Sequence, residues 1–229
     1  MGKETEQKQE IVNQGVHTYS QEESYVWPQE PILREQLEWF QDQKLALMVH
    51  WGMYNQLGMV ASWALSDEDA EWSRKTVDWT DDGELFKRQY RALNRAFDPV
   101  AFQPEEWAKM AKECGFRYLI LTTKHHDGFC LWDTAYTEYK TTAEECPFHT
   151  HKYADIVRAM FDAFRKEGLG IGAYFSKADW HCPDYWETEK ALTRKTTRNP
   201  TYDPKENPEA WERFRAFTRD QILELGKQY

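Results

Sequence analysis

The sequence predicts an α/β fold, with the first three βα units of a (β/α)8 TIM-like barrel. Three apolar runs, residues 45–49, 118–121 and 170–175, have the length and composition of buried strands, and a helical pattern follows each of them. Buried strands that alternate with helices are typical of a parallel sheet covered by helices. Polar and aromatic residues follow each run, as at the carboxyl ends of barrel strands, where active sites lie. An open doubly wound sheet has the same local order and remains the alternative.

The segments on either side of the first strand differ in character. Residues 1–28 are polar with few apolar anchors, so we expect a flexible N-terminal lead-in. A short helix is predicted over residues 32–41. Residues 53–103 form a long connection with several tryptophans, and a connection of this length is usually functional or contains small helices of its own.

Three longer helical patterns complete the chain. The first, over residues 104–114, has a proline near its start and Cys114 on its apolar face, where we expect it to be buried. The second covers residues 151–167, and the third covers residues 207–227 after a polar loop over residues 182–206. Only three of the eight strands of a barrel are visible, so we expect the chain to end before the fourth. The core candidates of the third helix are Trp211, Phe214, Ile222 and Leu225.

Composition narrows the class of partner. The net charge is −10, from 39 acidic and 29 basic residues, which argues against nucleic acid or an anionic membrane surface as a partner. No apolar run is long enough to span a bilayer, and residues 1–10 are too polar for a signal peptide. The four cysteines match no zinc template, so we expect no metal site, and whether any disulfide forms stays open.

Histidines and aromatic residues gather after the three strand runs. His50 follows the first run, the adjacent pair His125 and His126 follows the second, and Tyr174 and Trp180 lie at the end of the third and just after it. A single histidine at a strand end is more often structural, whereas an adjacent pair in the expected cleft favours a functional role. The sequence has 11 tryptophans, and aromatic faces are suited to stacking against sugar rings.

Short motifs stand at the strand ends and before the first of the long helices. They are His50-Trp51-Gly52, Phe97-Asp98-Pro99, the block from Lys124 to Phe129 with Trp132, Tyr174-Phe175-Ser176, and Asp179-Trp180. Together they resemble the α-L-fucosidases of glycoside hydrolase family 29, from about Trp39 to Tyr185, and the double-histidine block is the most specific part. The resemblance implies the N-terminal part of a (β/α)8 catalytic domain over residues 29–229, with the rest of the barrel and a C-terminal β-sandwich to follow.

The resemblance implies an exo-acting, retaining α-L-fucosidase that hydrolyses terminal α-L-fucose from glycans. Retaining hydrolysis uses two carboxyl groups, one as nucleophile and one as acid and base, so no cofactor is expected. In the family these groups are an aspartate at the end of the fourth strand and a later glutamate, both expected beyond Tyr229. The expected partner is a fucosylated glycan, and the family habit of acting on extracellular glycans implies a periplasmic or secreted protein.

The resemblance also implies that this chain carries a fucose-binding half-site. The histidines would bind sugar hydroxyls, Trp63 and Trp180 would line the pocket, and Tyr174 would approach the sugar ring. Many family members have an acid before the corresponding tryptophan, whereas this chain has Ser62 before Trp63, a difference that bears on substrate preference. The expected substrate-binding residues are His50, Trp63, His125, His126, Tyr174 and Trp180.

Two other functions stay open on the residues alone. The chain could be a non-catalytic fucose-binding remnant, unless Asp127 and Asp179, at neighbouring strand ends, replace the missing carboxyl groups. A metal-dependent barrel hydrolase would instead use His50, His125, His126 and Asp179 as zinc ligands, although that set does not complete a known template.

Overall fold

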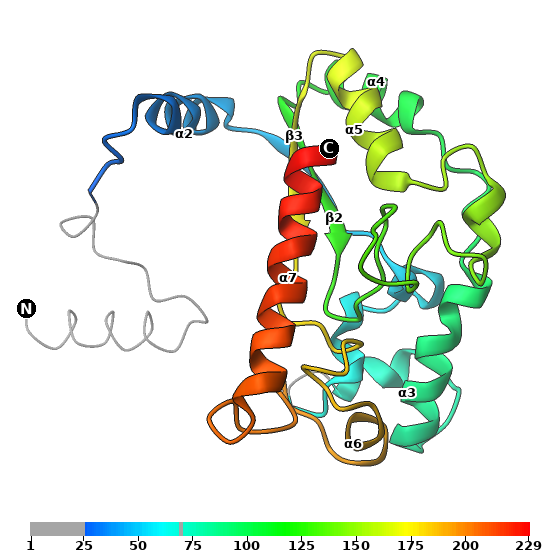
Figure 1. Cartoon of the computed structure of the whole chain (residues 1–229). Coiled ribbons are helices and arrows are strands. Elements are labelled where there is room, and N and C mark those ends of the chain that lie inside the picture. The colour runs from blue at the N-terminus through cyan, green and yellow to red at the C-terminus, as the bar shows by residue number, and fades with distance from the viewer. Residues whose placement is uncertain (1–25, 69–70) are drawn as a thin grey trace, which may run out of the picture. The chain divides into compact units, whose positions relative to one another are not determined.

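The computed structural model describes residues 26–68 and 71–229 (Figure 1). The predicted lead-in over residues 1–28 lies outside these ranges except for residues 26–28, which are in neither a helix nor a strand. Contacts divide the chain into two compact units, one ending at Lys44 and the other running from Leu45 to Tyr229.

The first unit contains the helix α2 (Pro31–Gln43). Pro31 lies in the first turn, where a missing N–H leaves no hydrogen bond unmade, and the Glu30 side chain accepts hydrogen bonds from backbone N–H groups of that turn. The helix ends at Lys44, whose φ of +61° leaves the helical path. The helix predicted over residues 32–41 is therefore confirmed and is slightly longer.

The second unit is built on a three-stranded parallel sheet in the order β1-β2-β3. Its strands are β1 (Ala46–Val49), β2 (Tyr118–Lys124) and β3 (Gly170–Phe175). Helices alternate with the strands along the chain, so the predicted α/β class is confirmed. β2 continues past its predicted end because the β-branched Thr122 and Thr123 suit an extended strand.

The parallel register brings the carboxyl ends of the strands together. Val49 pairs with Leu121, and Thr122 pairs with Tyr174. His50 follows Val49 directly, so it reaches the same level of the sheet as Thr122 and Tyr174. The residues that follow each strand therefore meet at one end of the sheet.

Two helices bury one face of the sheet. α4 (Pro104–Glu113) and α5 (Ile156–Lys166) pack against each other, and α5 also packs against β2 and β3 (Figure 1). Leu119 and Leu121 lie two residues apart on β2, so they point to the same face, and both are fully buried. Burying a side chain of this size stabilises the fold by about 1.5–3 kcal/mol. α5 contributes the buried residues Val157, Met160, Phe161 and Phe164.

The connections contain more helix than a plain loop would. As predicted, the long connection after β1 has small helices of its own, which are η2 (Met53–Leu57), η3 (Ala61–Leu65), η4 (Glu71–Thr76), α3 (Gly83–Arg91) and η5 (Ala92–Ala96). The segment predicted as a polar loop over residues 182–206 contains α6 (Thr188–Thr193) and the buried Trp186, so that prediction is wrong in part. η6 (Pro147–Thr150) precedes α5, and α7 (Pro208–Gln228) is the last helix.

Across the described ranges, no helix combines the length and apolarity needed to cross a membrane.

Three predictions of detail are wrong. α5 begins at Ile156 and not at residue 151, because the Asp155 side chain accepts a hydrogen bond from a backbone N–H of the first turn and starts the helix there. Cys114 is exposed, because it caps the C-terminal end of α4 beyond the buried face of that helix. Ile222 is 43% exposed because it lines an open cavity beside α7, although Phe214 and Leu225 are buried as predicted. All four cysteines are free.

The turns after β2 and β3 approach each other closely at Gly128. This residue has a φ of +80°, which side chains rarely tolerate. A Cβ atom at this position would lie 2.5 Å from Oδ1 of Asp179 and 2.7 Å from Cβ of His181. A glycine is therefore required here both for its backbone conformation and for the space it leaves.

We expect Gly128→Ala to lower the melting temperature more than Gly168→Ala does. Gly168 also has a positive φ, +76°, but nothing lies within 4 Å of a Cβ atom there. The control should therefore cost only the backbone strain, about 1–2 kcal/mol, whereas Gly128→Ala adds overpacking worth about 1–3 kcal/mol. Thermal unfolding followed by circular dichroism compares the two variants. Equal melting temperatures would show that the close approach of the two turns at Gly128 does not affect stability.

Candidate functional site

The six residues predicted to bind substrate lie in one continuous group of rings, which we call the ring cluster. The His50 ring centroid lies 5.0 Å from that of His125, which lies 4.8 Å from that of His126. Tyr174 lies 5.7 Å from His50, across the sheet. The structure thus brings together residues from three strand ends and one connection, while their binding roles stay predictions. The ring cluster consists of His50, Trp63, His125, His126, Tyr174 and Trp180.

The two tryptophans of the ring cluster contact His126 and each other, with 5.8 Å between the Trp63 and Trp180 ring centroids. The ring of Trp63, on η3, lies 5.0 Å from the His126 ring, and the ring of Trp180 stacks on His126 at 4.8 Å with an interplanar angle of 22°. Trp180 is only 1% exposed and stacks in turn on Trp186 at 4.8 Å. Trp180 is therefore a buried support for His126. Of the two tryptophans in the ring cluster, only Trp63 is half-buried.

Each histidine of the ring cluster uses its Nδ1 atom in a hydrogen bond within the protein. His50 Nδ1 lies 3.3 Å from Oγ1 of Thr122, and His125 Nδ1 contacts the hydroxyl of Ser62. His126 Nδ1 lies 2.9 Å from the backbone carbonyl of Ala178. These bonds fix the ring orientations and leave the Nε2 atoms for other partners.

The imidazoles of the ring cluster are neutral near pH 7. Burial lowers the pKa of His50 and of His126 below the ordinary value, and burial together with the neighbouring His126 and His50 lowers the pKa of His125 to about 2. A neutral imidazole has one donor and one acceptor, so it can bind a hydroxyl group in either sense. The site is therefore suited to an uncharged, hydroxyl-rich ligand.

Tyr54 and Arg198 join this site although the sequence did not single them out. Tyr54, on η2, is 1% exposed, and its ring lies 5.5 Å from His50 and 5.6 Å from His125. Gly52 makes this possible, because a Cβ atom there would lie 2.6 Å from the Tyr54 ring. The Arg198 guanidinium lies 4.4 Å from the Trp63 ring centroid. Neither residue stands in a motif or periodic pattern that could have marked it.

A buried ion pair joins two residues that directly precede members of the ring cluster, Lys124 before His125 and Asp179 before Trp180. Nζ of Lys124 lies 2.8 Å from Oδ2 of Asp179, and the two side chains are 0% and 3% exposed. Lys124 also donates to Oε1 of Gln221 at 3.1 Å, which attaches α7 to the end of β2. Burial raises the pKa of Asp179, but the charge of Lys124 and the hydrogen bond from it outweigh burial, so the net pKa is lowered.

Both acids considered as an alternative carboxyl pair are engaged in the scaffold. Oδ1 of Asp179 accepts from the backbone N–H groups of His181 and Cys182 at 2.9 and 2.8 Å, while Oδ2 accepts from the lysine. Asp127 accepts from the hydroxyl of Tyr90 at 2.8 Å and from the backbone N–H of Phe129 at 3.1 Å. Burial raises the pKa of Asp127 to about 6. Each carboxylate oxygen therefore already has a partner.

The proposed zinc ligands do not converge on one point. Asp179 is held by the lysine and by backbone N–H groups, and His125 and His126 turn their Nδ1 atoms toward different partners. In residues 26–68 and 71–229, no three histidine, cysteine, aspartate or glutamate side chains are grouped so that they could hold a metal. The geometry does not favour the metal-dependent alternative.

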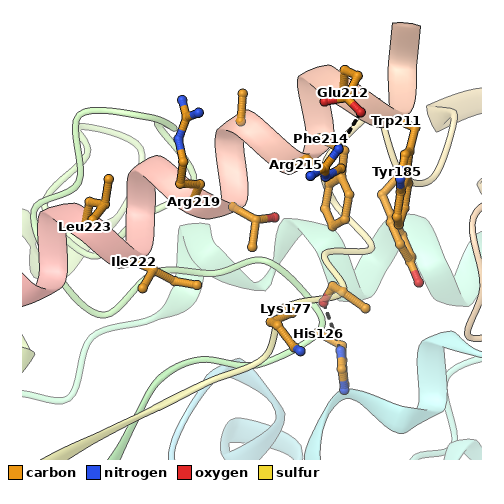
Figure 2. A pocket seen from close by; sticks show the side chains of 13 residues that line it. His126, Lys177, Tyr185, Trp211, Glu212, Phe214, Arg215, Arg219, Ile222 and Leu223 are labelled. Carbon is orange, nitrogen blue, oxygen red and sulfur yellow. Dashed lines mark hydrogen bonds and ion pairs between the residues drawn. The ribbon is translucent and has the colours of Figure 1, made fainter. Parts of the chain in front are cut away.

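An open cavity of about 880 Å³ borders the ring cluster at His126 (Figure 2). Lys177 and Ala178, which follow β3, form one wall with His126, and one face of α7 forms the other. The α7 wall includes Ile222 and Leu223, so it is mainly apolar there. The ring cluster is thus approachable from this side at the His126 position.

We expect Lys124→Met to lower the free energy of unfolding by about 3–5 kcal/mol, because it leaves the Asp179 carboxylate buried without its partner. Adding Asp179→Asn should recover part of this loss. Lys109→Met is the control, because it removes an exposed pair with Glu106 at 3.0 Å and should change stability by less than about 1 kcal/mol. Urea unfolding measures all three, and similar losses for the two single variants would contradict the expected role of burial.

Comparisons with known proteins agree on one family. The family model for α-L-fucosidases matches residues 12–229. α-L-Fucosidase 1 of Arabidopsis thaliana is 37% identical over 92 residues, which are 40% of this chain and 18% of that protein. Plasma α-L-fucosidase of Rattus norvegicus is 29% identical over 158 residues, 69% of this chain and 33% of that protein.

A solved structure is similar over most of the chain. It is an α-L-fucosidase of glycoside hydrolase family 29 from Bacteroides thetaiotaomicron, trapped as a covalent intermediate with 2-fluoro-fucosyl fluoride. The TM-score is 0.63 at 32% identity, covering 90% of this chain and 40% of that one. The chain thus matches between 18% and 40% of the length of these three proteins. Because the family model matches nearly the whole sequence, the chain belongs to the α-L-fucosidase family.

Proposed function

We propose that this chain carries the fucose-binding half of the active site of an exo-acting, retaining α-L-fucosidase. The observation that carries the proposal is the ring cluster, in which neutral imidazoles and aromatic rings meet at the carboxyl ends of three parallel strands. Three imidazoles offer hydrogen bonds to several hydroxyl groups of one monosaccharide. The half-buried Trp63 and Tyr174 offer apolar ring faces to the sugar.

The proposed reaction is hydrolysis through a covalent glycosyl-enzyme intermediate. One carboxylate attacks the anomeric carbon, and a second carboxyl group protonates the leaving oxygen and then activates water. The trapped covalent intermediate of the Bacteroides thetaiotaomicron protein supports this route for a relative. In this chain Asp127 and Asp179 have other partners, so we assign the nucleophilic aspartate and the acid/base glutamate to sequence beyond Tyr229. No cofactor takes part.

We further propose that the three-stranded sheet is the first part of a (β/α)8 barrel. The order β1-β2-β3, parallel and joined by helices, supports this, as does the match to 40% of the Bacteroides thetaiotaomicron chain. Residues 29–229 would then be the N-terminal portion of the catalytic barrel, completed by the remaining strands and followed by a β-sandwich. The substrate would be a fucosylated glycan met in the periplasm or outside the cell, with no nucleic acid partner and no insertion into the membrane.

A non-catalytic fucose-binding protein is the second candidate, because both acids beside the ring cluster are held by other groups. Calorimetry with L-fucose and an assay with 4-nitrophenyl α-L-fucoside separate the possibilities. Binding without turnover by the 229-residue chain is expected for the half-site. Turnover by this chain would show that its own acids are sufficient, and the absence of fucose binding would overturn the proposal.

We expect His126→Ala to weaken fucose binding about tenfold, the effect of losing one well-formed hydrogen bond worth about 1.4 kcal/mol. His149→Ala is the control, because His149 is exposed and lies outside the ring cluster. Calorimetric titration gives both dissociation constants, and melting temperatures confirm that both variants fold. An unchanged dissociation constant in His126→Ala would remove this histidine from the proposed site.

Any loss of fucose affinity on acidification should be centred below the ordinary histidine pKa of about 6.5. Histidines with an ordinary pKa of about 6.5 would keep only about a quarter of their neutral form at pH 6. Burial lowers the pKa of all three imidazoles, so their neutral forms persist to a lower pH than in an ordinary histidine. The charged groups acting on His126 are Lys124, Asp179 and Arg198, and they partly cancel. Titrations at several pH values test this, and a loss of affinity centred near pH 6.5 would contradict it.

A further inference from the structure

The adjacent histidines of the ring cluster have different hydrogen-bond partners at the same ring atom. His126 Nδ1 lies 2.9 Å from a backbone carbonyl oxygen, that of Ala178, and Figure 2 shows this bond as a dashed line from the His126 ring. His125 Nδ1 contacts a hydroxyl group, that of Ser62. A carbonyl oxygen can only accept a hydrogen bond, whereas a hydroxyl group can donate or accept one. The two partners therefore need not place the ring hydrogen on the same nitrogen in the two imidazoles.

The partner of His126 fixes its tautomer. Because the Ala178 carbonyl has no proton to give, Nδ1 of His126 must carry the hydrogen. The ring is neutral near pH 7, since burial lowers its pKa, and a neutral ring has one N–H only. Nε2 of His126 is therefore a hydrogen-bond acceptor.

The partner of His125 fixes the opposite tautomer. Ser62 is fully buried, and in the part of the chain that the structure describes its hydroxyl bonds to His125 alone. If Nδ1 donated to this hydroxyl, the serine proton would be buried without an acceptor, at a cost of about 1–3 kcal/mol. The hydroxyl therefore donates to Nδ1, and Nε2 of His125 carries the hydrogen.

We propose that Ser62 is a positioning residue that locks His125 and His126 in opposite tautomers. Their Nε2 atoms then form a matched pair, with a donor on His125 and an acceptor on His126, on rings 4.8 Å apart. The pair selects a ligand that offers one hydroxyl as an acceptor and a second as a donor. This selection of a diol rests on the proposed sugar-binding function, whereas the tautomers themselves do not.

Nitrogen NMR of the isotopically labelled chain tests the tautomers without any ligand. We expect Nδ1 of His125 and Nε2 of His126 to resonate as unprotonated ring nitrogens, and the other nitrogen of each ring as protonated. The same tautomer in both histidines, or a mixture in His125, would overturn the proposal. If fucose fails to bind while the tautomers differ as stated, the proposed function fails and this assignment stands.

Variants at Ser62 show whether the serine is responsible. In Ser62→Ala, His125 should become a mixture of tautomers while His126 is unchanged, and Ser62→Thr, which keeps the hydroxyl, should restore the single form. Equal tautomer populations halve the competent fraction, which weakens fucose binding about twofold. Ser66→Ala is the matched control, because Ser66 is also buried but bonds to the Glu68 backbone. A single His125 tautomer in folded Ser62→Ala would overturn the role of the serine.

Deoxyfluoro sugars test the selection of hydroxyl groups, because fluorine cannot donate a hydrogen bond. Among L-fucose derivatives fluorinated at C2, C3 or C4, we expect one to bind about tenfold more weakly, the derivative that lacks the donor to His126. In His126→Ala this penalty should disappear, since the acceptor is gone. A penalty that is the same with and without His126 would overturn the assignment of its Nε2 as the acceptor.

Discussion

The buried pair between Lys124 and Asp179 is the contact on which the site depends. Lys124 directly precedes His125 and His126, and Asp179 directly precedes Trp180, so one ion pair joins the two turns that carry these rings. The backbone N–H of Trp180 also donates to the carbonyl of His126 at 2.7 Å. The stacking of Trp180 on His126 is a consequence of this double attachment. Burying two charges costs desolvation free energy. The hydrogen bond from Lys124 to Gln221 and those from backbone N–H groups to Asp179 offset part of that cost.

Burial acts on the two kinds of titratable group in the site in opposite ways. The carboxylate of Asp179 stays charged because a lysine lies 2.8 Å away. The imidazoles have no acidic partner at hydrogen-bond distance among the described residues, so the same burial keeps them neutral. The charge of Asp179 is thus paired with Lys124, and the imidazoles of the ring cluster are uncharged. This separation suits a sugar, whose hydroxyl groups bind neutral donors and acceptors.

The sequence predicted features that depend on a local pattern of residues. It did not predict contacts between segments that are far apart in the chain. The apolar runs predicted the three strands, and parallel pairing then brought His50, Thr122 and Tyr174 to one level. The contact between Ser62 and His125 joins residues 63 positions apart through an irregular connection, and no periodicity marks it. Tyr54 was missed for the same reason. The start of α5 was misplaced because an apolar stripe does not show which polar residue caps the helix.

The serine in front of Trp63 contacts His125 without adding a charge to the ring cluster. A carboxylate bonded to Nδ1 of His125 would stabilise the imidazolium, raise its pKa and force Nδ1 to be the donor. The adjacent His126 would then face a positive charge at a ring separation of 4.8 Å. A hydroxyl avoids this, because it can give its proton to Nδ1 and adds no charge. Ser62 therefore allows a neutral His125 to offer a ligand the N–H of Nε2, whereas a neutral ring that donates from Nδ1 would offer only an acceptor there.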